Sequence, residues 1–287
     1  MYGIPCAGQK SDYSVWVTDH QFGPFGIGTG LDSSEHSMEA ARVAEELGYP
    51  TLWLSGGPLP GLQTIIDLIG ATNSIKIASG ILAVGKYSAA DVSTTYAAVE
   101  ASAPGRFIVG LGGAHGPKPV ATLSAYLDEV DVPVERRVLA ALGPRMLELA
   151  RDKSAGGYPF LVTAAYSAEA RKVLGPDKLL AVNHLVVLES DADRARAIAR
   201  DTIGFFPRIP AYAASLKRQG FTEQDQAELP DHMVDALAAW GTPADIKAKL
   251  SEHLDAGADH VAVNVITGVT GPQPIEEWRA LAPTLLA

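Results

Sequence analysis

The sequence of 287 residues predicts a single-domain (β/α)₈ barrel, the TIM-barrel fold. Eight strand patterns, each followed by a helix pattern, run from one end of the chain to the other without a low-complexity linker. Most of the strand segments are continuous apolar runs, which is typical of parallel strands covered on both faces. A doubly wound sheet is the alternative, but it normally has fewer strands and a phosphate loop near its start, and neither is seen.

In chain order, the first half of the barrel is expected as follows. A strand at 13–18 precedes a Gly-rich loop through residues 23–30, and Ser33 or Ser34 then caps a helix that ends at Gly48. The next strands are expected at 51–55, 75–82 and 106–112, because each is a short apolar run followed by a helix pattern. The helices between them are expected at 62–69, 89–103 and 120–130.

The second half repeats the pattern, with one long interruption. Strands are expected at 137–143, 158–163, 180–188 and 260–266, with helices starting near 144, 168, 193, 243 and 274. Residues 205–241 carry five Pro or Gly breaks and predict an insertion of short helices between the seventh and eighth strands.

The composition limits the classes of partner and compartment. A formal charge of −10 and a pI near 5.1 argue against nucleic acid, whose phosphates would be repelled. Cys6 is the only cysteine, so an intramolecular disulfide is impossible, and a reducing cytoplasm is expected. The sequence has neither a secretory leader nor an apolar run long enough for a membrane span. We therefore expect a cytoplasmic protein that acts on a small molecule.

Several common catalytic motifs are absent. Gly110-Leu111-Gly112 lacks the third glycine of the dinucleotide fingerprint, and neither a phosphate-binding loop, a zinc-binding His-Glu-x-x-His nor a Gly-x-Ser-x-Gly elbow is found. The histidines are too scattered for a metal-dependent barrel hydrolase, so no metal site is predicted. These gaps favour chemistry carried by a bound organic cofactor.

The fourth strand supplies the strongest candidate for catalysis. Phe107 to Leu111 are apolar, and the segment then ends in Gly112, Gly113, Ala114 and His115. Glycines would let the backbone approach a flat ligand. His115 would follow the carboxyl end of the strand, where α/β barrels place their chemistry, as an acid/base group or hydrogen-bond donor. The alternative is an ordinary loop histidine.

The turn Gly143-Pro144-Arg145 is the best candidate for anion binding. A glycine before a proline at the first helical turn leaves free backbone N–H groups at the positive end of the helix dipole, and Arg145 adds charge. From the pattern alone, an ordinary strand-to-helix turn is the commoner interpretation. Ser79-Gly80-Ile81 is a candidate backbone platform for a flat ring, with a buried strand as its alternative. Trp16, Ser55 and His20 are candidates for the substrate pocket.

Several segments together resemble the luciferase-like monooxygenase superfamily. The most specific is Pro-Gly-Arg-Phe-x-x-Gly-Leu-Gly at 104–112. The segments at 138–146, 158–163, 237–241 and 254–261 resemble an actinobacterial branch of oxidoreductases that use the deazaflavin coenzyme F420. The resemblance extends from about Tyr13 to Ile266.

This resemblance implies where a cofactor would lie. The ring would rest at the bulge after the third strand, often a non-proline cis peptide in relatives, which corresponds to Gly80-Ile81. The end of the fourth strand, at Gly113, Ala114 and His115, would contact substrate and cofactor. The phosphate would bind at the turn after the fifth strand. The implied cofactor residues are Ser79, Gly80, Ile81, Gly112, Gly113, Ala114, Leu142, Gly143, Pro144, Arg145, Met146 and Thr163.

The sequence departs from better-known deazaflavin dehydrogenases at two points. Ser55-Gly56 stands where they carry an Asp-His pair, and His115 stands where they carry a glutamate. The leading hypothesis is hydride transfer between F420 and a small organic substrate. The alternatives are a flavin mononucleotide (FMN) monooxygenase and a barrel that binds without catalysis. By analogy with relatives, a homodimer is also expected.

Overall fold

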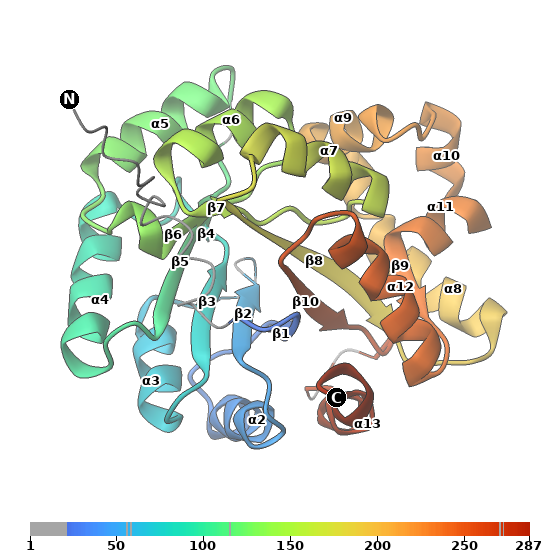
Figure 1. Ribbon diagram of the computed structural model, residues 1–287, viewed down its shortest axis with the longest axis horizontal. Helices are drawn as coiled ribbons and strands as arrows, with labels where there is room; N and C mark the ends of the chain where they lie inside the picture. Colours follow the sequence, from blue (N-terminus) through green and yellow to red (C-terminus); the bar gives the residue numbers. More distant parts are fainter. Residues whose placement is uncertain (1–21, 56, 58, 115, 270, 272) are drawn as a thin grey trace, which may run out of the picture.

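A computed structural model describes residues 22–55, 57, 59–114, 116–269, 271 and 273–287. Within these residues eight parallel strands close into a barrel, with helices around the outside (Figure 1). The ring closes because β8 (Leu179–Val187) pairs in parallel with β10 (His260–Val265), which in turn pairs with β1 (Phe25–Thr29). The predicted fold class is confirmed.

The remaining strands follow the order expected for this fold. From β1 the ring continues through β2, β3 with its short continuation β4, β5, β6 and β7 to β8. Their bounds are β2 Thr51–Ser55, β3 Lys76–Gly80, β4 Leu82–Ala83, β5 Phe107–Gly112, β6 Arg137–Leu139 and β7 Gly156–Gly157.

Helices connect the strands on the outer face of the barrel. Their bounds are α2 Glu35–Glu46, α3 Gln63–Ala71, α4 Ala89–Ser102, α5 Pro119–Glu129, α6 Pro144–Lys153, α7 Ala164–Leu174, α8 Ala192–Ile203, α12 Pro243–Asp255 and α13 Ile275–Leu285. Ser34 is the cap of α2, since its hydroxyl accepts a hydrogen bond from the N–H of Ser37. In the part of the chain that the structure describes, none of the helices has the length and apolar character to cross a membrane.

The first strand does not lie where the sequence suggested. The predicted strand at 13–18 falls outside the described residues, and the predicted Gly-rich loop at 23–30 contains β1. Gly26 and Gly28 serve in a strand because their missing side chains leave room inside the barrel. A Cβ on Gly26 would lie 2.8 Å from the ring of His260. Close packing, rather than a turn, explains the glycine at position 26.

Two later predictions also need correction. The predicted strand 137–143 is paired only over β6, and the predicted strand at 158–163 is replaced by β7, which precedes it. Beyond β7 only Phe160 forms a further bridge, to Asn183 of β8. A short strand, β9 (Ala238–Trp240), takes over pairing with the carboxyl half of β8, and the sequence analysis missed it.

An aromatic stack fills the middle of the barrel. Trp53 is fully buried and stacks on Tyr158 with ring centroids 4.1 Å apart. Its indole N–H donates to Nε2 of His260 at 2.9 Å, and Nδ1 of His260 lies 2.8 Å from the carbonyl oxygen of Gly23. Because indole can only donate, His260 carries its proton on Nδ1 and is neutral. Trp53 is therefore part of the core.

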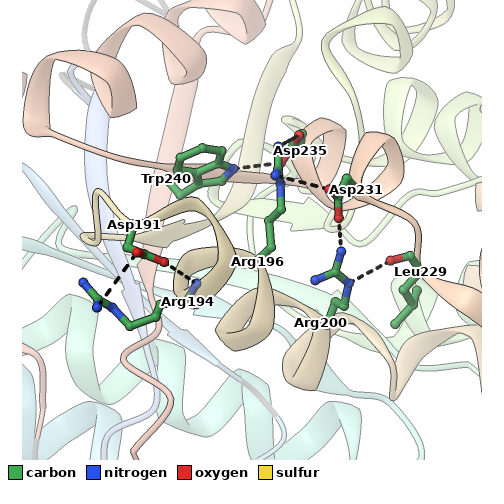
Figure 2. Close-up of polar contacts among 8 residues, drawn as sticks. All are labelled: Asp191, Arg194, Arg196, Arg200, Leu229, Asp231, Asp235 and Trp240. Atoms are coloured by element: carbon green, nitrogen blue, oxygen red, sulfur yellow. Dashed lines mark hydrogen bonds and ion pairs between the residues drawn. The ribbon is translucent and has the colours of Figure 1, made fainter.

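The insertion between β8 and β10 contains the predicted short helices. They are η2 (Phe206–Arg208), α9 (Pro210–Arg218), α10 (Glu223–Glu228) and α11 (Asp231–Leu237). Figure 2 shows how α8 holds α11: Arg196 pairs with Asp235 at 2.7 Å and with Asp231 at 3.2 Å.

Further contacts complete this junction. Arg200 also pairs with Asp231 and donates to the carbonyl oxygen of Leu229, while the indole of Trp240 donates to Asp235 at 2.8 Å (Figure 2). The guanidinium of Arg196 lies over the Trp240 ring. These contacts fix the insertion to the barrel wall.

Buried histidines make the stability of the fold depend on pH. Burial lowers the pKa of both His253 and His260 to about 4. The unfolded chain therefore binds more protons between about pH 6.5 and pH 4, and the folded state loses stability as the pH falls through that window. We expect a loss of up to ~3 kcal/mol per histidine in the free energy of unfolding, measured by urea titration at pH 7.5, 5.5 and 4.5.

A matched pair of variants isolates this effect. His260→Gln should show a smaller loss of unfolding free energy between pH 7.5 and 4.5 than the unmodified protein. His232→Gln, which replaces an exposed histidine, should keep the full loss. If His260→Gln and the unmodified protein lost the same unfolding free energy between pH 7.5 and 4.5, His260 would not contribute to the pH dependence of stability.

Candidate functional site

A bulge in the third strand shapes the carboxyl end of the barrel. Ala78 pairs with Ile108, but Leu82 pairs with Leu111, so three residues of one strand face two of the other. At the bulge, the Ser79 side chain takes the place of a backbone partner for Gly110. Its hydroxyl accepts from the N–H of Gly110 at 2.8 Å and donates to the carbonyl oxygen of Gly110 at 3.0 Å. The hydroxyl of Ser79 is fully buried and used within the protein.

The bulge presents Gly80 and Ile81, which we call the ledge, at the barrel end. Both are half-buried, and the peptide bond between them is cis. A Cβ on Gly110 or Gly112 would lie 3.3 Å or 3.2 Å from the Ile81 side chain, so two glycines of β5 make room for it. The ledge is thus held from below by β5.

The glycines at the end of β5 are required by packing between strands. The sequence predicted that Gly112 and Gly113 leave space for a ligand. A Cβ on Gly112 would instead stand 2.7 Å from the Cβ of Ala140, and one on Gly113 would stand 3.0 Å from the Cβ of Ala83. The space is taken by neighbouring strands. Ala114, next along, is half-buried and packs against the main core.

The turn after β6 lies next to the ledge. Ala140, which touches Gly112, is followed within three residues by Gly143, the cap residue of α6. No side chain caps this helix, and Pro144 occupies its first turn, as the sequence predicted. Arg145 is exposed in the same turn, whereas Leu142 and Met146 are half-buried against the core. Pro144 has no N–H, and the N–H of Met146 donates to the carbonyl oxygen of Gly143 at 3.0 Å, so the N–H of Arg145 is the one left at the positive end of the α6 dipole in this turn.

The insertion adds a second arginine at this turn. Arg218, the last residue of α9, donates to the carbonyl oxygen of Leu142 at 3.0 Å, and its guanidinium lies 3.5 Å from the position of a Cβ on Gly143. The neighbouring Gln219 accepts from the N–H of Thr163 at 2.8 Å and donates to the carbonyl oxygen of Leu161 at 3.2 Å. The end of α9 thus joins the ends of β6 and β7.

Thr163 has a structural use in this arrangement. Its hydroxyl caps α7 by accepting from the N–H of Tyr166 at 3.3 Å. Ser55, at the end of β2, is half-buried and stands beside Gly80 in the register of the strands. Ser55 is therefore the predicted pocket residue that the structure brings to the ledge.

Three predicted site residues lie outside the described residues. They are His115, Trp16 and His20. The sequence also did not predict a role for Arg218, at the turn after β6, or for the pair Tyr158 and Asn183, in the barrel interior. No local pattern marks them, because each acts through a contact with a strand far away in the sequence. In the residues that the structure covers, no three His, Cys, Asp or Glu side chains gather as metal ligands would.

Comparison with known proteins gives relatives over most of the chain. No family model matches the sequence. The 5,10-methylenetetrahydromethanopterin reductase of Methanolobus tindarius is 24% identical over 290 residues, which span 77% of this chain and 87% of the reductase. The N-acetyl-S-alkylcysteine monooxygenase of Bacillus subtilis is 30% identical over 145 residues, 41% of this chain and 42% of that enzyme.

Three solved structures share the fold. The coenzyme F420-dependent tetrahydromethanopterin reductase of Methanopyrus kandleri superposes with a TM-score of 0.70 at 16% identity, over 92% of this chain and 99% of the reductase. An F420-dependent secondary alcohol dehydrogenase gives 0.68 at 14% identity, over 92% and 99%. The FMN-bound oxygenating constituent of 3,6-diketocamphane monooxygenase from Pseudomonas putida gives 0.65 at 12% identity, over 91% and 97%.

These likenesses show that the chain shares the barrel fold of F420-dependent and FMN-dependent enzymes. The relatives are reductases, dehydrogenases and monooxygenases, which agrees with the prediction of an oxidoreductase. The actinobacterial branch, the cytoplasmic location and the homodimer stay predictions.

The role of Ser79 in the bulge can be tested by stability. Ser79→Ala removes both hydrogen bonds to Gly110 and leaves that buried N–H and carbonyl without this partner, so we expect unfolding free energy to fall by about 1–3 kcal/mol. Urea denaturation would measure the change. Ser102→Ala, which removes an exposed hydroxyl that donates to carbonyl oxygens of its own helix α4, is the control for loss of a hydroxyl. Equal stability of Ser79→Ala and the unmodified protein would contradict this role.

Proposed function

We propose that this chain is an F420-dependent oxidoreductase that transfers a hydride between the deazaflavin coenzyme and a small organic substrate. The observation that carries the proposal is the continuity of the ledge with the α6 turn. Ile81 packs on Gly112, Gly112 touches Ala140, and Gly143 follows. A flat ring with an anionic tail needs an apolar support next to an anion site, and this end of the barrel offers both.

Each part of the site has a defined task in this proposal. Gly80 and Ile81 would support one face of the ring, and their cis peptide is the feature that the family resemblance led us to expect. The N–H of Arg145 at the start of α6, with the side chains of Arg145 and Arg218, would bind the phosphate of the tail. When bound, the coenzyme supplies the redox chemistry, while the protein orients the substrate and limits access of water.

The proton that accompanies hydride transfer needs a separate group. We assign it to His115 on the family resemblance, which aligns this residue with the end of the fourth strand. His115→Ala should lower turnover about 10²-fold and leave the affinity for the coenzyme within a few-fold, because the loss falls on general acid/base catalysis. Steady-state kinetics with reduced coenzyme and a panel of small carbonyl compounds would measure turnover. Unchanged turnover would exclude this role.

The proposal is tested first by binding. Purified protein would be titrated with F420 and, separately, with FMN, following fluorescence. Micromolar or tighter binding of F420 alone supports hydride transfer. Preference for FMN would move the protein to oxygen chemistry, the second candidate, and binding of neither would contradict both.

A matched pair of arginine variants tests the phosphate site in the same assay. Arg218→Gln should weaken coenzyme binding several-fold, and the remaining affinity should depend less on salt, because one positive charge near the tail is lost. Arg151→Gln removes an exposed arginine from the last turn of α6, at the end of that helix opposite the proposed phosphate site, and should leave the affinity unchanged. Equal affinities for both variants would argue against a phosphate at this turn.

A further inference from the structure

An unpaired polar group lies in the interior of the barrel. Asn183, in the middle of β8, is 5% exposed. Its side-chain N–H donates to the hydroxyl of Tyr158 at 3.0 Å, but its oxygen Oδ1 has no hydrogen-bond partner among the described residues. An unpaired buried amide oxygen costs about 1–3 kcal/mol, so its retention calls for an explanation.

The amide lies close to the ledge. The hydroxyl of Tyr158 is the link, since it accepts from Asn183 and lies 3.1 Å from the position of a Cβ on Gly80. On the other side, a Cβ on Gly28 would lie 3.6 Å both from Nδ2 of Asn183 and from the Cβ of Asn264. A Cβ on Gly80 would also lie 2.8 Å from the Tyr158 ring, so glycine at 80 lets Tyr158 pack beside the ledge. Tyr158 thereby links the ledge to the amide of Asn183.

The surroundings define the chemistry of a matching group. The cluster that fills the barrel interior is apolar: Phe22, Trp53, Ala78, Ile108, Val138, Tyr158, Leu179, Ala181 and Ala262. Burial raises the pKa of Tyr158, which keeps its phenol protonated, and burial lowers that of His260 to about 4, which keeps its imidazole neutral. A charged group would be poorly solvated here, whereas a neutral N–H or O–H donor would complete the hydrogen bonding of Asn183.

We propose that Asn183 Oδ1 accepts a hydrogen bond from the lactam N–H at the pyrimidine edge of a flavin-type ring. This inference rests on the proposed function and adds a residue that positions the ring. Both F420 and FMN carry that N–H. The anionic tail would lie at Gly143 while the neutral edge of the ring points towards Tyr158 and Asn183.

The test compares cofactors that carry the lactam N–H with derivatives in which this N–H is methylated. FMN, F420 and their N3-methyl derivatives would be titrated against the unmodified protein and Asn183→Leu, following fluorescence. Methylation should weaken binding to the unmodified protein about 10-fold or more, the value of one buried hydrogen bond. Asn183→Leu should bind the unmethylated ring more weakly by a similar factor and should no longer discriminate the methylated one.

Thr51→Val is the matched control. Thr51 begins β2, at the opposite end of that strand from the ledge, and its buried hydroxyl oxygen also lacks a partner among the described residues. Thr51→Val should keep the full preference for the unmethylated ring. In thermal unfolding without cofactor, Thr51→Val should melt at or above the temperature of the unmodified protein, because it removes an unpaired buried atom. Asn183→Leu should melt lower than Thr51→Val, because it also removes the hydrogen bond to the buried Tyr158 hydroxyl.

The outcomes separate the inference from the proposed function. If the unmodified protein binds the ring but tolerates methylation, Asn183 pairs with something else, such as an internal water or a substrate hydroxyl, and only the inference fails. The same holds if Asn183→Leu binds unmethylated ring as tightly as the unmodified protein does. If neither cofactor binds, both fail. Because the methylated probes test the unmodified protein directly, the inference is falsifiable even if Asn183→Leu does not fold.

Discussion

The site depends on the register shift between β3 and β5. Pairing changes from Ala78 with Ile108 to Leu82 with Leu111, and the extra residue is accommodated because the Ser79 hydroxyl satisfies both backbone groups of Gly110. Without this pair of hydrogen bonds the strand would continue its alternation and turn Ile81 away from the interior. The ledge therefore depends on the Ser79 hydroxyl, which makes the two hydrogen bonds to Gly110 that a neighbouring strand would otherwise make.

The glycines near the ledge serve packing before they serve binding. Gly110 admits the carbonyl oxygen of Ser79, which would lie 1.8 Å from a Cβ there, and Gly112 admits Ala140. Close contact between β5 and its two neighbours fixes the height of Ile81 relative to the α6 turn. A larger residue at either position would separate the two halves of the proposed site, so the short distance between ring support and anion site is set by backbone contact.

The sequence predicted those features of the fold and the site that depend on local residue patterns. Apolar runs and caps located most strands and helices, and the family resemblance pointed to Gly80-Ile81 and to Gly143. It failed where tertiary packing overrides composition, as at Gly26 and Gly28, which look like a loop but form β1. It also missed Arg218 and Asn183. Their importance comes from contacts with Leu142 and Tyr158, 76 and 25 residues away along the chain.

The distribution of charge along the barrel determines which kind of ligand fits the proposed site. The interior holds a neutral phenol, a neutral imidazole and an amide among apolar side chains, whereas arginines appear at the rim. Since charge is poorly solvated inside and well solvated at the rim, a ligand that satisfies both regions must be neutral and flat at one end and anionic at the other. A sugar phosphate has no flat apolar part, and a lone aromatic compound has no anion. A ring cofactor with a phosphate tail has both.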